Sequence, residues 1–261
     1  MGAAINRYAA ISGQFYGNRL LFGDPADARS VAIEVASRNE IEVFKRVAAD
    51  QLVRERRPLR LFALAAGRDL FEGFRVPHDL IDLAGGFRFR YLAEFRSVEA
   101  LEAARRHLRK VTGKAPGASD APYLVLADPI EQYLMLTGTT LFMGMQFGDL
   151  HRMQLDIETY VSAGFEFPSA ARPGDRVIAI ALTDSRGFER VLSAREMDER
   201  TMLLELVRIV RERDPDVIEG HNLFRFDLEY LETRARRHHL TLALGRDGSG
   251  LRARASRMQD L

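Results

Sequence analysis

The sequence contains no cysteine, which excludes disulfide bonds, thiolate zinc sites and cysteine nucleophiles. Lysine is nearly as rare, because only Lys45, Lys110 and Lys114 among the 38 basic residues are lysine. The rest are arginine, whose guanidinium suits bidentate phosphate contacts, although a GC-rich coding sequence is the simpler explanation. No stretch approaches the roughly 18 apolar residues of a membrane span, and residues 1–10 lack a signal-peptide core, so we expect a cytoplasmic protein without a membrane partner.

Several catalytic motifs are also missing from the sequence. It has no Gly-x-x-x-x-Gly-Lys, Gly-x-Gly-x-x-Gly, His-Glu-x-x-His or Gly-x-Ser-x-Gly pattern, which argues against the nucleotide-binding, zinc-protease and serine-hydrolase chemistries that use them. The net charge of +1 gives no overall attraction to nucleic acid. Any such binding must therefore come from local patches.

The 261 residues are enough for two domains of ordinary size, and we place a boundary near residue 150. Residues 1–150 alternate strand-like and helix-like segments, which predicts an α+β domain. The expected strands are 30–35, 59–65, 87–95 and 123–127. The expected helices are 39–56 with Asn39 as a cap, 97–109 with Ser97 as a cap, and 128–138 with proline at its first position.

Residues 151–261 are easier to interpret. The order is strand (155–158), strand (176–183), hairpin turn (184–187), strand (188–192), helix after Asp198, strand (216–219) and a last helix to about residue 237. This order predicts an α/β layer with a hairpin on one edge of a mixed sheet.

The stretch 153–160 organises this second half. In a β-strand, Leu155 and Ile157 point to one face, whereas Asp156 and Glu158 point to the other. In a helix the two carboxylates would diverge, as they do for the equally spaced pair in the helical pattern around Asp227. A lone Asp-x-Glu is common on solvated strands, so the pair needs a partner to indicate a site.

The partner is the stretch 219–227, where a short strand turns into a helix. Ligands bind at such crossings at the carboxyl ends of strands in open α/β sheets. We expect Asp227, near the start of the helix, to converge with Asp156 and Glu158. Clustered carboxylates repel unless a cation compensates, and all-oxygen ligands favour Mg²⁺ or Mn²⁺. Two such ions about 4 Å apart clamp the attacking and leaving oxygens of a phosphodiester.

Leu155-Asp156-Ile157-Glu158-Thr159 resembles the first exonuclease motif of family B DNA polymerases, and the stretch from Asn222 to Phe226-Asp227 is similar to the second, Asn-x-x-x-Phe-Asp. The resemblance covers about residues 123–240. It implies that residues 151–261 form a ribonuclease H-like 3′–5′ exonuclease domain. Residues 1–150 fit the family's N-terminal domain only in position and α/β character.

The resemblance also implies roles for these residues. Asp156 would bridge two metal ions, Glu158 would hold one and orient the water, and Asp227 would hold the second. Asn222 would contact the 3′-terminal nucleotide of single-stranded DNA, and Phe226 would pack beneath the site. Helix capping by Asn222 and a core position for Phe226 are the structural alternatives.

The family's third motif, Tyr-x-x-x-Asp, supplies the last metal-binding aspartate. Tyr230 is the only tyrosine after Asp227, and Arg234 stands four positions beyond it. We therefore expect an incomplete exonuclease domain without polymerase motifs. The chain is then an N-terminal piece of a polymerase or a stand-alone relative that carries the exonuclease domain, a non-catalytic nucleic-acid-binding module, or a truncated chain.

The sequence after Thr233 is rich in basic residues. This tail either tracks a phosphate backbone or is a solvated helix end followed by a disordered terminus. The residues concerned are Arg234, Arg236, Arg237, His238, His239, Arg246, Arg252, Arg254 and Arg257.

Overall fold

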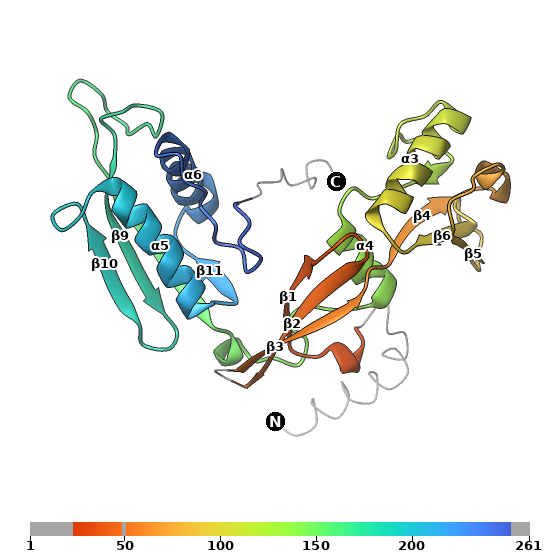
Figure 1. The fold of residues 1–261 in the computed structure, drawn as a ribbon, viewed down its shortest axis with the longest axis horizontal. Helices are drawn as coiled ribbons and strands as arrows, with labels where there is room; N and C mark the ends of the chain where they lie inside the picture. Colours follow the sequence, from red (N-terminus) through yellow and green to blue (C-terminus); the bar gives the residue numbers. More distant parts are fainter. Residues whose placement is uncertain (1–22, 49–50, 252–261) are drawn as a thin grey trace, which may run out of the picture. The chain divides into compact units, whose positions relative to one another are not determined.

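The computed structural model describes residues 23–48 and 51–251. The chain divides into two compact units, Met1–Met145 and Gln146–Leu261, which are described separately below. In Figure 1 the colours run from red in the first unit to blue in the second. Within the described ranges, no helix combines the length and the apolar character needed to cross a membrane.

The first unit contains a three-stranded antiparallel sheet in the order β1-β2-β3. Its strands are β1 (Ser30–Val35), β2 (Glu40–Ala48) and β3 (Gln51–Pro58), preceded by the 3-10 turn η1 (Pro25–Asp27). The helix predicted over 39–56 is therefore wrong. Val43 and Phe44 are adjacent and both buried, because β2 is covered on both faces and pairs with a strand on each side. This long-range pairing overrides the local helical spacing.

A second sheet in the first unit has the order β5-β6-β4-β7. Its strands are β4 (Leu61–Ala65), β5 (Asp79–Asp82), β6 (Tyr91–Phe95) and β7 (Tyr123–Leu124), with the 3-10 turn η2 (Arg68–Phe71) after β4. The strand predicted over 87–95 is shorter than expected, since it starts at Tyr91 and Phe87 is 81% exposed. The one predicted over 123–127 has only the two residues of β7.

Both later helices of the first unit begin with a side-chain cap, and the cap at Ser97 and the proline at the start of the second helix were predicted. α3 (Val98–Thr112) begins after Ser97, whose side chain accepts a hydrogen bond from the Ala100 amide, and ends at Gly113 in the left-handed region. α4 (Pro129–Thr137) begins after Asp128, whose side chain accepts from the Ile130 amide. These caps satisfy backbone groups that a helix end leaves unpaired, which explains why local sequence was enough to place the helices.

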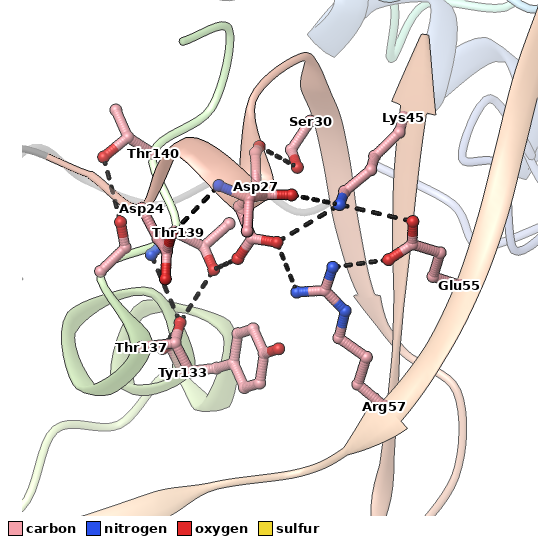
Figure 2. Close-up of polar contacts among 12 residues, drawn as sticks. Asp24, Asp27, Ser30, Lys45, Glu55, Arg57, Tyr133, Thr137, Thr139 and Thr140 are labelled. Carbon is pink, nitrogen blue, oxygen red and sulfur yellow. Dashed lines mark hydrogen bonds and ion pairs between the residues drawn. The ribbon is translucent and has the colours of Figure 1, made fainter. Parts of the chain in front are cut away.

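A cluster of charged side chains connects η1, β2, β3 and the segment after α4 (Figure 2). Asp27 pairs with Arg57 at 2.7 Å and with Lys45 at 3.3 Å, and it accepts a hydrogen bond from Thr139 at 2.6 Å. Glu55 contacts the same two cations. Burial acts to raise the pKa of Asp27, but Thr139, Arg57 and Lys45 outweigh it and hold the pKa below the ordinary value. Each of these acids is therefore matched by a cation.

The second unit contains a four-stranded mixed sheet in the order β10-β9-β8-β11. β8 (Arg152–Thr159), β9 (Val177–Asp184) and β10 (Glu189–Ser193) are antiparallel neighbours, whereas β11 (Val217–Glu219) lies parallel to β8. The unit starts with the 3-10 turn η3 (Phe147–Asp149). The predicted element order and the hairpin at one edge are confirmed.

Two helices, α5 (Glu199–Arg213) and α6 (Leu228–Arg237), complete this unit and lie against the sheet (Figure 1). Asp198 caps α5 as predicted by accepting a hydrogen bond from the Thr201 amide at 2.7 Å. Met153, Leu155 and Ile157 of β8 pack in one core with apolar residues of both helices. The helices therefore cover one face of β8, and the other face is open.

Arg234 and Arg246 of the basic tail neither track a phosphate backbone nor lie on a solvated helix end, the two interpretations of this tail. Arg234 is buried and bonds to Glu199 through both Nε (2.7 Å) and Nη2 (2.6 Å). Arg246 bonds to Asp214 at 2.6 Å and to Asp216 at 2.9 Å. These guanidinium groups hold α6 and the segment after it against the domain. Arg252, Arg254 and Arg257 lie outside the described residues.

Candidate active site

The carboxylates of β8 lie on the open face of the sheet. Exposure alternates along the strand, with Leu155 and Ile157 buried and Asp156 and Glu158 exposed, which confirms the strand interpretation of this stretch. The residue of β9 across from each carboxylate is an alanine, Ala181 for Asp156 and Ala179 for Glu158. These small neighbours leave both carboxylates accessible from above the sheet.

β11 brings the second motif, residues 222–227, next to the carboxylates of β8. Its last residue, Glu219, pairs with Gln154, so the chain leaves the sheet next to Leu155 and Asp156. Gly220 approaches β8 closely, and a Cβ atom there would lie 2.4 Å from the carbonyl oxygen of Leu155. Only glycine permits this approach. Gly220 could not be singled out from the sequence, because the constraint comes from a strand far away in the chain.

The segment after β11 is not the simple helix start that was predicted. Leu223–Asp227 forms a π-helical turn, η4, in which the Leu228 amide bonds to the Leu223 carbonyl, and α6 begins only afterwards. Such turns are frequent at functional sites. Asn222 adopts a left-handed conformation (φ 56°) and makes no side-chain cap hydrogen bond, so helix capping is not its role. Its amide group is left exposed.

Asp227 is only 2% exposed, and its Oδ2 atom has no hydrogen-bond partner. Burial raises the pKa of this carboxyl, and the negative charge of Asp156 raises it further, while His221 opposes both effects. The structure thus brings Asp227 within electrostatic range of Asp156. A buried carboxylate beside another carboxylate is costly unless a cation joins them.

Asp227 differs from the other buried acids of the described residues in its lack of a cationic side chain in contact. Each of the others contacts at least one arginine, lysine or histidine side chain. The pairs are Asp27 with Arg57 and Lys45, Glu94 with Arg60, Asp175 with Arg172, Asp184 with His151 and Arg213, and Glu199 with Arg234 and His238. Among the described residues, every buried acid therefore has a cationic partner except Asp227, which lies beside Asp156.

The donor set around Asp156 and Asp227 fits a hard divalent cation. The available atoms are carboxylate oxygens, one of them buried and unpartnered, and such ligands suit Mg²⁺ or Mn²⁺. Glu158 lies on the same face of β8. In the described part of the chain, however, no three His, Asp or Glu side chains gather closely enough to enclose a metal ion by themselves.

Phe226 is partly buried and packs on the core of the second unit, with its ring 5.2 Å from that of Tyr230. It also lines a groove of about 290 Å³ between α6 and the loop that follows β8. Arg225 and Ser169 face the same groove. The core position of Phe226 does not exclude the predicted position beneath the site.

The exonuclease domain of DNA polymerase family B matches residues 142–260. These residues form an exonuclease domain of the family B DNA polymerase type. The resemblance predicted from the two motifs is thereby confirmed, and the mixed sheet with its two helices is the ribonuclease H-like part of this domain. At the level of the family, this match supports a 3′–5′ exonuclease.

Archaeal DNA polymerases resemble this exonuclease region in sequence. That of Archaeoglobus fulgidus is 34% identical over 113 residues, which cover 43% of this chain and 14% of the relative. DNA polymerase 1 of Pyrococcus abyssi is 34% identical over 128 residues, covering 46% of this chain and 16% of the relative. The chain thus spans only a small part of the length of these relatives.

The fold likeness extends beyond the exonuclease domain. The family B DNA polymerase of Pyrobaculum calidifontis matches 84% of this chain and 33% of its own length, with a TM-score of 0.57 and 22% sequence identity. Such coverage includes part of the first unit. At this identity the likeness establishes the fold and leaves the chemistry to the residues of the site.

Proposed function

We propose that the exonuclease domain hydrolyses the 3′-terminal phosphodiester of single-stranded DNA and releases a 5′-mononucleotide. Asp156, Glu158 and Asp227 would hold two divalent cations, Mg²⁺ or Mn²⁺. When bound, such ions lower the pKa of a coordinated water and stabilise the charge that develops on the phosphate oxygens. The family match supports the reaction class, and the positions of the carboxylates support their roles.

The observation that carries this proposal is the buried, unpartnered carboxylate of Asp227 beside Asp156. Asp227 offers a fixed oxygen because the π-helical turn and the core hold its backbone. Asp156 and Glu158 offer oxygens from β8, which pairs with β9 over residues 153–159 and with β11 just before them, at residues 152–154. The carboxylates of β8 are thus preorganised on a rigid element, which is how catalytic metal sites avoid reorganisation during the reaction.

Further residues would contact the substrate or support the site in this proposal. Asn222 lies exposed at the turn between β11 and η4, where its free amide group would bond to the terminal nucleotide. Phe226 would support the site from below while lining the groove beside α6. The exposed rings of Phe165 and Phe167, on the loop after β8, are suitable for stacking against bases of a single strand.

The proposed activity is tested with the full chain, a 5′-labelled single-stranded oligonucleotide and either Mg²⁺ or Mn²⁺. We expect stepwise shortening from the 3′ end that stops when EDTA is added. The matched control is Asp156→Asn, which keeps the size of the side chain and removes its charge. If the wild-type chain leaves the oligonucleotide intact with both metals, catalysis by this chain is excluded.

A second candidate function is a non-catalytic module that binds single-stranded nucleic acid. The observation that favours it is that the carboxylates do not close around a metal ion in the described part of the chain. A filter-binding assay in EDTA separates the two functions. A non-catalytic module would bind the strand equally well with and without Mn²⁺ and leave it uncut, whereas the exonuclease would cut it once metal is present.

We also propose that the domain works beside a polymerase domain, since its relatives are much longer DNA polymerases. Residues 1–150 would then be the N-terminal domain of a family B polymerase, and residues 151–261 the exonuclease domain. Reading the coding sequence beyond Leu261 for a Tyr-x-x-x-Asp motif and for polymerase motifs tests this proposal. A stop codon at that point, with no polymerase gene beside it, would contradict it.

A further inference from the structure

A row of polar side chains crosses the open face of the sheet, and its member on β8 lies two residues before Asp156. Thr183, Gln154 and Glu219 are opposite one another on β9, β8 and β11. Thr183 Oγ1 donates to Gln154 Oε1 at 3.0 Å, and Gln154 Nε2 donates to Glu219 Oε1. Gln154 uses both ends of its amide group and joins three strands.

Glu219 is the end of this row and the last residue of β11. β11 has three residues and lies at an edge of the sheet, with β8 as its only neighbour in the described structure. The Glu219 carboxylate also accepts from Arg152 Nη1 at 2.7 Å, and the Arg152 guanidinium lies 3.9 Å from the centre of the Phe147 ring. Side-chain bonds thus supplement the few backbone bonds of a short strand.

The position of the second motif depends on this strand. Gly220 follows Glu219 directly and lies against Leu155, and Asp227 is reached through one turn and η4. A one-residue slip in strand pairing would turn every side chain of β11 to the opposite face. It would also displace Asn222 and Asp227 from Asp156. The bond between Gln154 and Glu219 opposes such a slip, because it forms only in the observed register.

We propose that Gln154 is a positioning residue of the exonuclease site. It holds the register of β11 through Glu219 and thereby sets the distance from Asp227 and Asn222 to Asp156. This inference rests on the exonuclease function proposed above. Gln154 has no catalytic role in it, because its amide oxygen is bonded to Thr183 and its amide nitrogen to Glu219.

Exchanging the two bonded groups tests the proposal in the full chain. Gln154→Glu places two carboxylates against each other and breaks the bond. Glu219→Gln keeps an acceptor for the Gln154 amide and is expected to stay near wild type. In the double variant, the new amide at position 219 donates to the new carboxylate at position 154, which restores the bond with donor and acceptor reversed. Glu189→Gln is the control for charge, because Glu189 lies in the same row on β10 across from Thr183.

The first measurement is the steady-state hydrolysis of single-stranded DNA. We expect Gln154→Glu to lower kcat by about tenfold to a hundredfold, since small misplacements of catalytic groups have effects of this size. KM should change little, and the double variant should recover to within about threefold of wild type. A loss of kcat in the double variant equal to that of Gln154→Glu would overturn the proposal.

The second measurement is hydrogen exchange of the backbone amides in β11 and residues 220–227, without metal or DNA. Loss of the bond should speed this exchange by about tenfold in Gln154→Glu, and the double variant should return to wild type. If Gln154→Glu does not fold, Thr183→Val takes its place in this measurement. It removes only the bond from Thr183 to Gln154 and should speed the amide exchange about threefold. This measurement needs no catalysis, so an inactive wild-type chain would count against the proposed function and leave the positioning role open to test. Unchanged exchange in Gln154→Glu would exclude that role.

Discussion

Two groups of carboxylates in this chain lie in opposite electrostatic environments. In the first unit, Asp27 and Glu55 share Arg57 and Lys45, and the pKa values of both acids are lowered (Figure 2). In the second unit, Asp227 has an unpartnered buried oxygen, and its pKa is raised by burial and by Asp156. The first group stabilises the fold by itself. The second is costly to the fold as long as no cation compensates its charge.

The comparison separates structural acids from acids that are available to a ligand. Buried charges are normally paired, and removing one partner of a buried pair is strongly destabilising. An unpaired buried acid is expected only where a ligand supplies the missing charge. The same criterion distinguishes Asp227 from Asp175, Asp184 and Glu199 within its own domain, since those three have cationic partners.

The largest expected effect is on catalysis. Asp156→Ala should reduce hydrolysis of single-stranded DNA by about a thousandfold, because it removes a ligand of the cations that would lower the pKa of the attacking water. The thermal unfolding temperature without metal should stay unchanged or rise slightly, since the repulsion of Asp227 disappears. Glu205→Ala, on α5 away from the site, is the control and should cut DNA normally. Retention of more than about a tenth of the wild-type rate would contradict the role of Asp156.

The next effect concerns the paired cluster. Asp27→Ala should lower the free energy of unfolding by about 3 kcal/mol, because Arg57 and Lys45 lose their shared buried partner. Urea unfolding of the full chain measures this change. Asp79→Ala, which removes an exposed pair with Arg96 at 3.4 Å, is the comparison and should cost less than about 0.5 kcal/mol. Equal losses in the two variants would show that the buried cluster has no special weight.

A smaller effect is expected at Gly220. Gly220→Ala should lower the free energy of unfolding by about 2 kcal/mol, because its Cβ would lie 2.4 Å from the Leu155 carbonyl oxygen and β11 must move away. It should also lower kcat through the displacement of Asp227. Gly73→Ala gives the contrast, since the space beside its Cβ is free and only its backbone conformation (φ 73°) is strained. A Gly220→Ala chain with wild-type stability and kcat would argue against the close approach.

The smallest effect has the opposite sign. Asp227→Asn should raise the free energy of unfolding without metal by about 1 kcal/mol near neutral pH, because it removes an unpaired buried charge. The pKa of Asp227 in the folded chain is raised above the ordinary 3.8. Its charge therefore destabilises the fold at a pH above the folded pKa, and this destabilisation disappears as the pH falls through the folded pKa toward 3.8. The difference between variant and wild type in urea should therefore shrink from about pH 7 to about pH 4.

A different pH dependence is expected for Asp27, the paired acid. The pKa of Asp27 is lowered from 3.8, so its stabilisation is present above that value and is lost only as the pH falls below it, through the folded pKa. Between about pH 7 and pH 4 the deficit of Asp27→Ala should stay constant. Parallel pH profiles for the two variants would remove the distinction between the two groups of acids.

Much of the candidate site could be predicted from the sequence. The alternation around Asp156 and the caps at Ser97 and Asp198 are local signals, and the structure contains each of them. The prediction failed where long-range contacts decide. Phe44 lies in a strand because β2 is paired on both sides, and Arg234 is internal because Glu199 reaches it from α5.

The details that make the site were also invisible in the sequence. The π-helical turn at Asp227 and the close approach of Gly220 depend on how β11 meets β8. The same is true of the bond between Gln154 and Glu219, which are 65 positions apart in the chain. Neither residue belongs to a motif, so spacing alone could not select them.

The central claim is that Asp156 and Asp227 form a cation site, and direct titration with Mn²⁺ tests it without relying on catalysis. Electron paramagnetic resonance of free Mn²⁺ should show binding to the wild-type chain and clearly weaker binding to Asp156→Asn and to Asp227→Asn, while Asp79→Asn binds like wild type. Equal Mn²⁺ binding by all four chains, or none by the wild type, would contradict the claim.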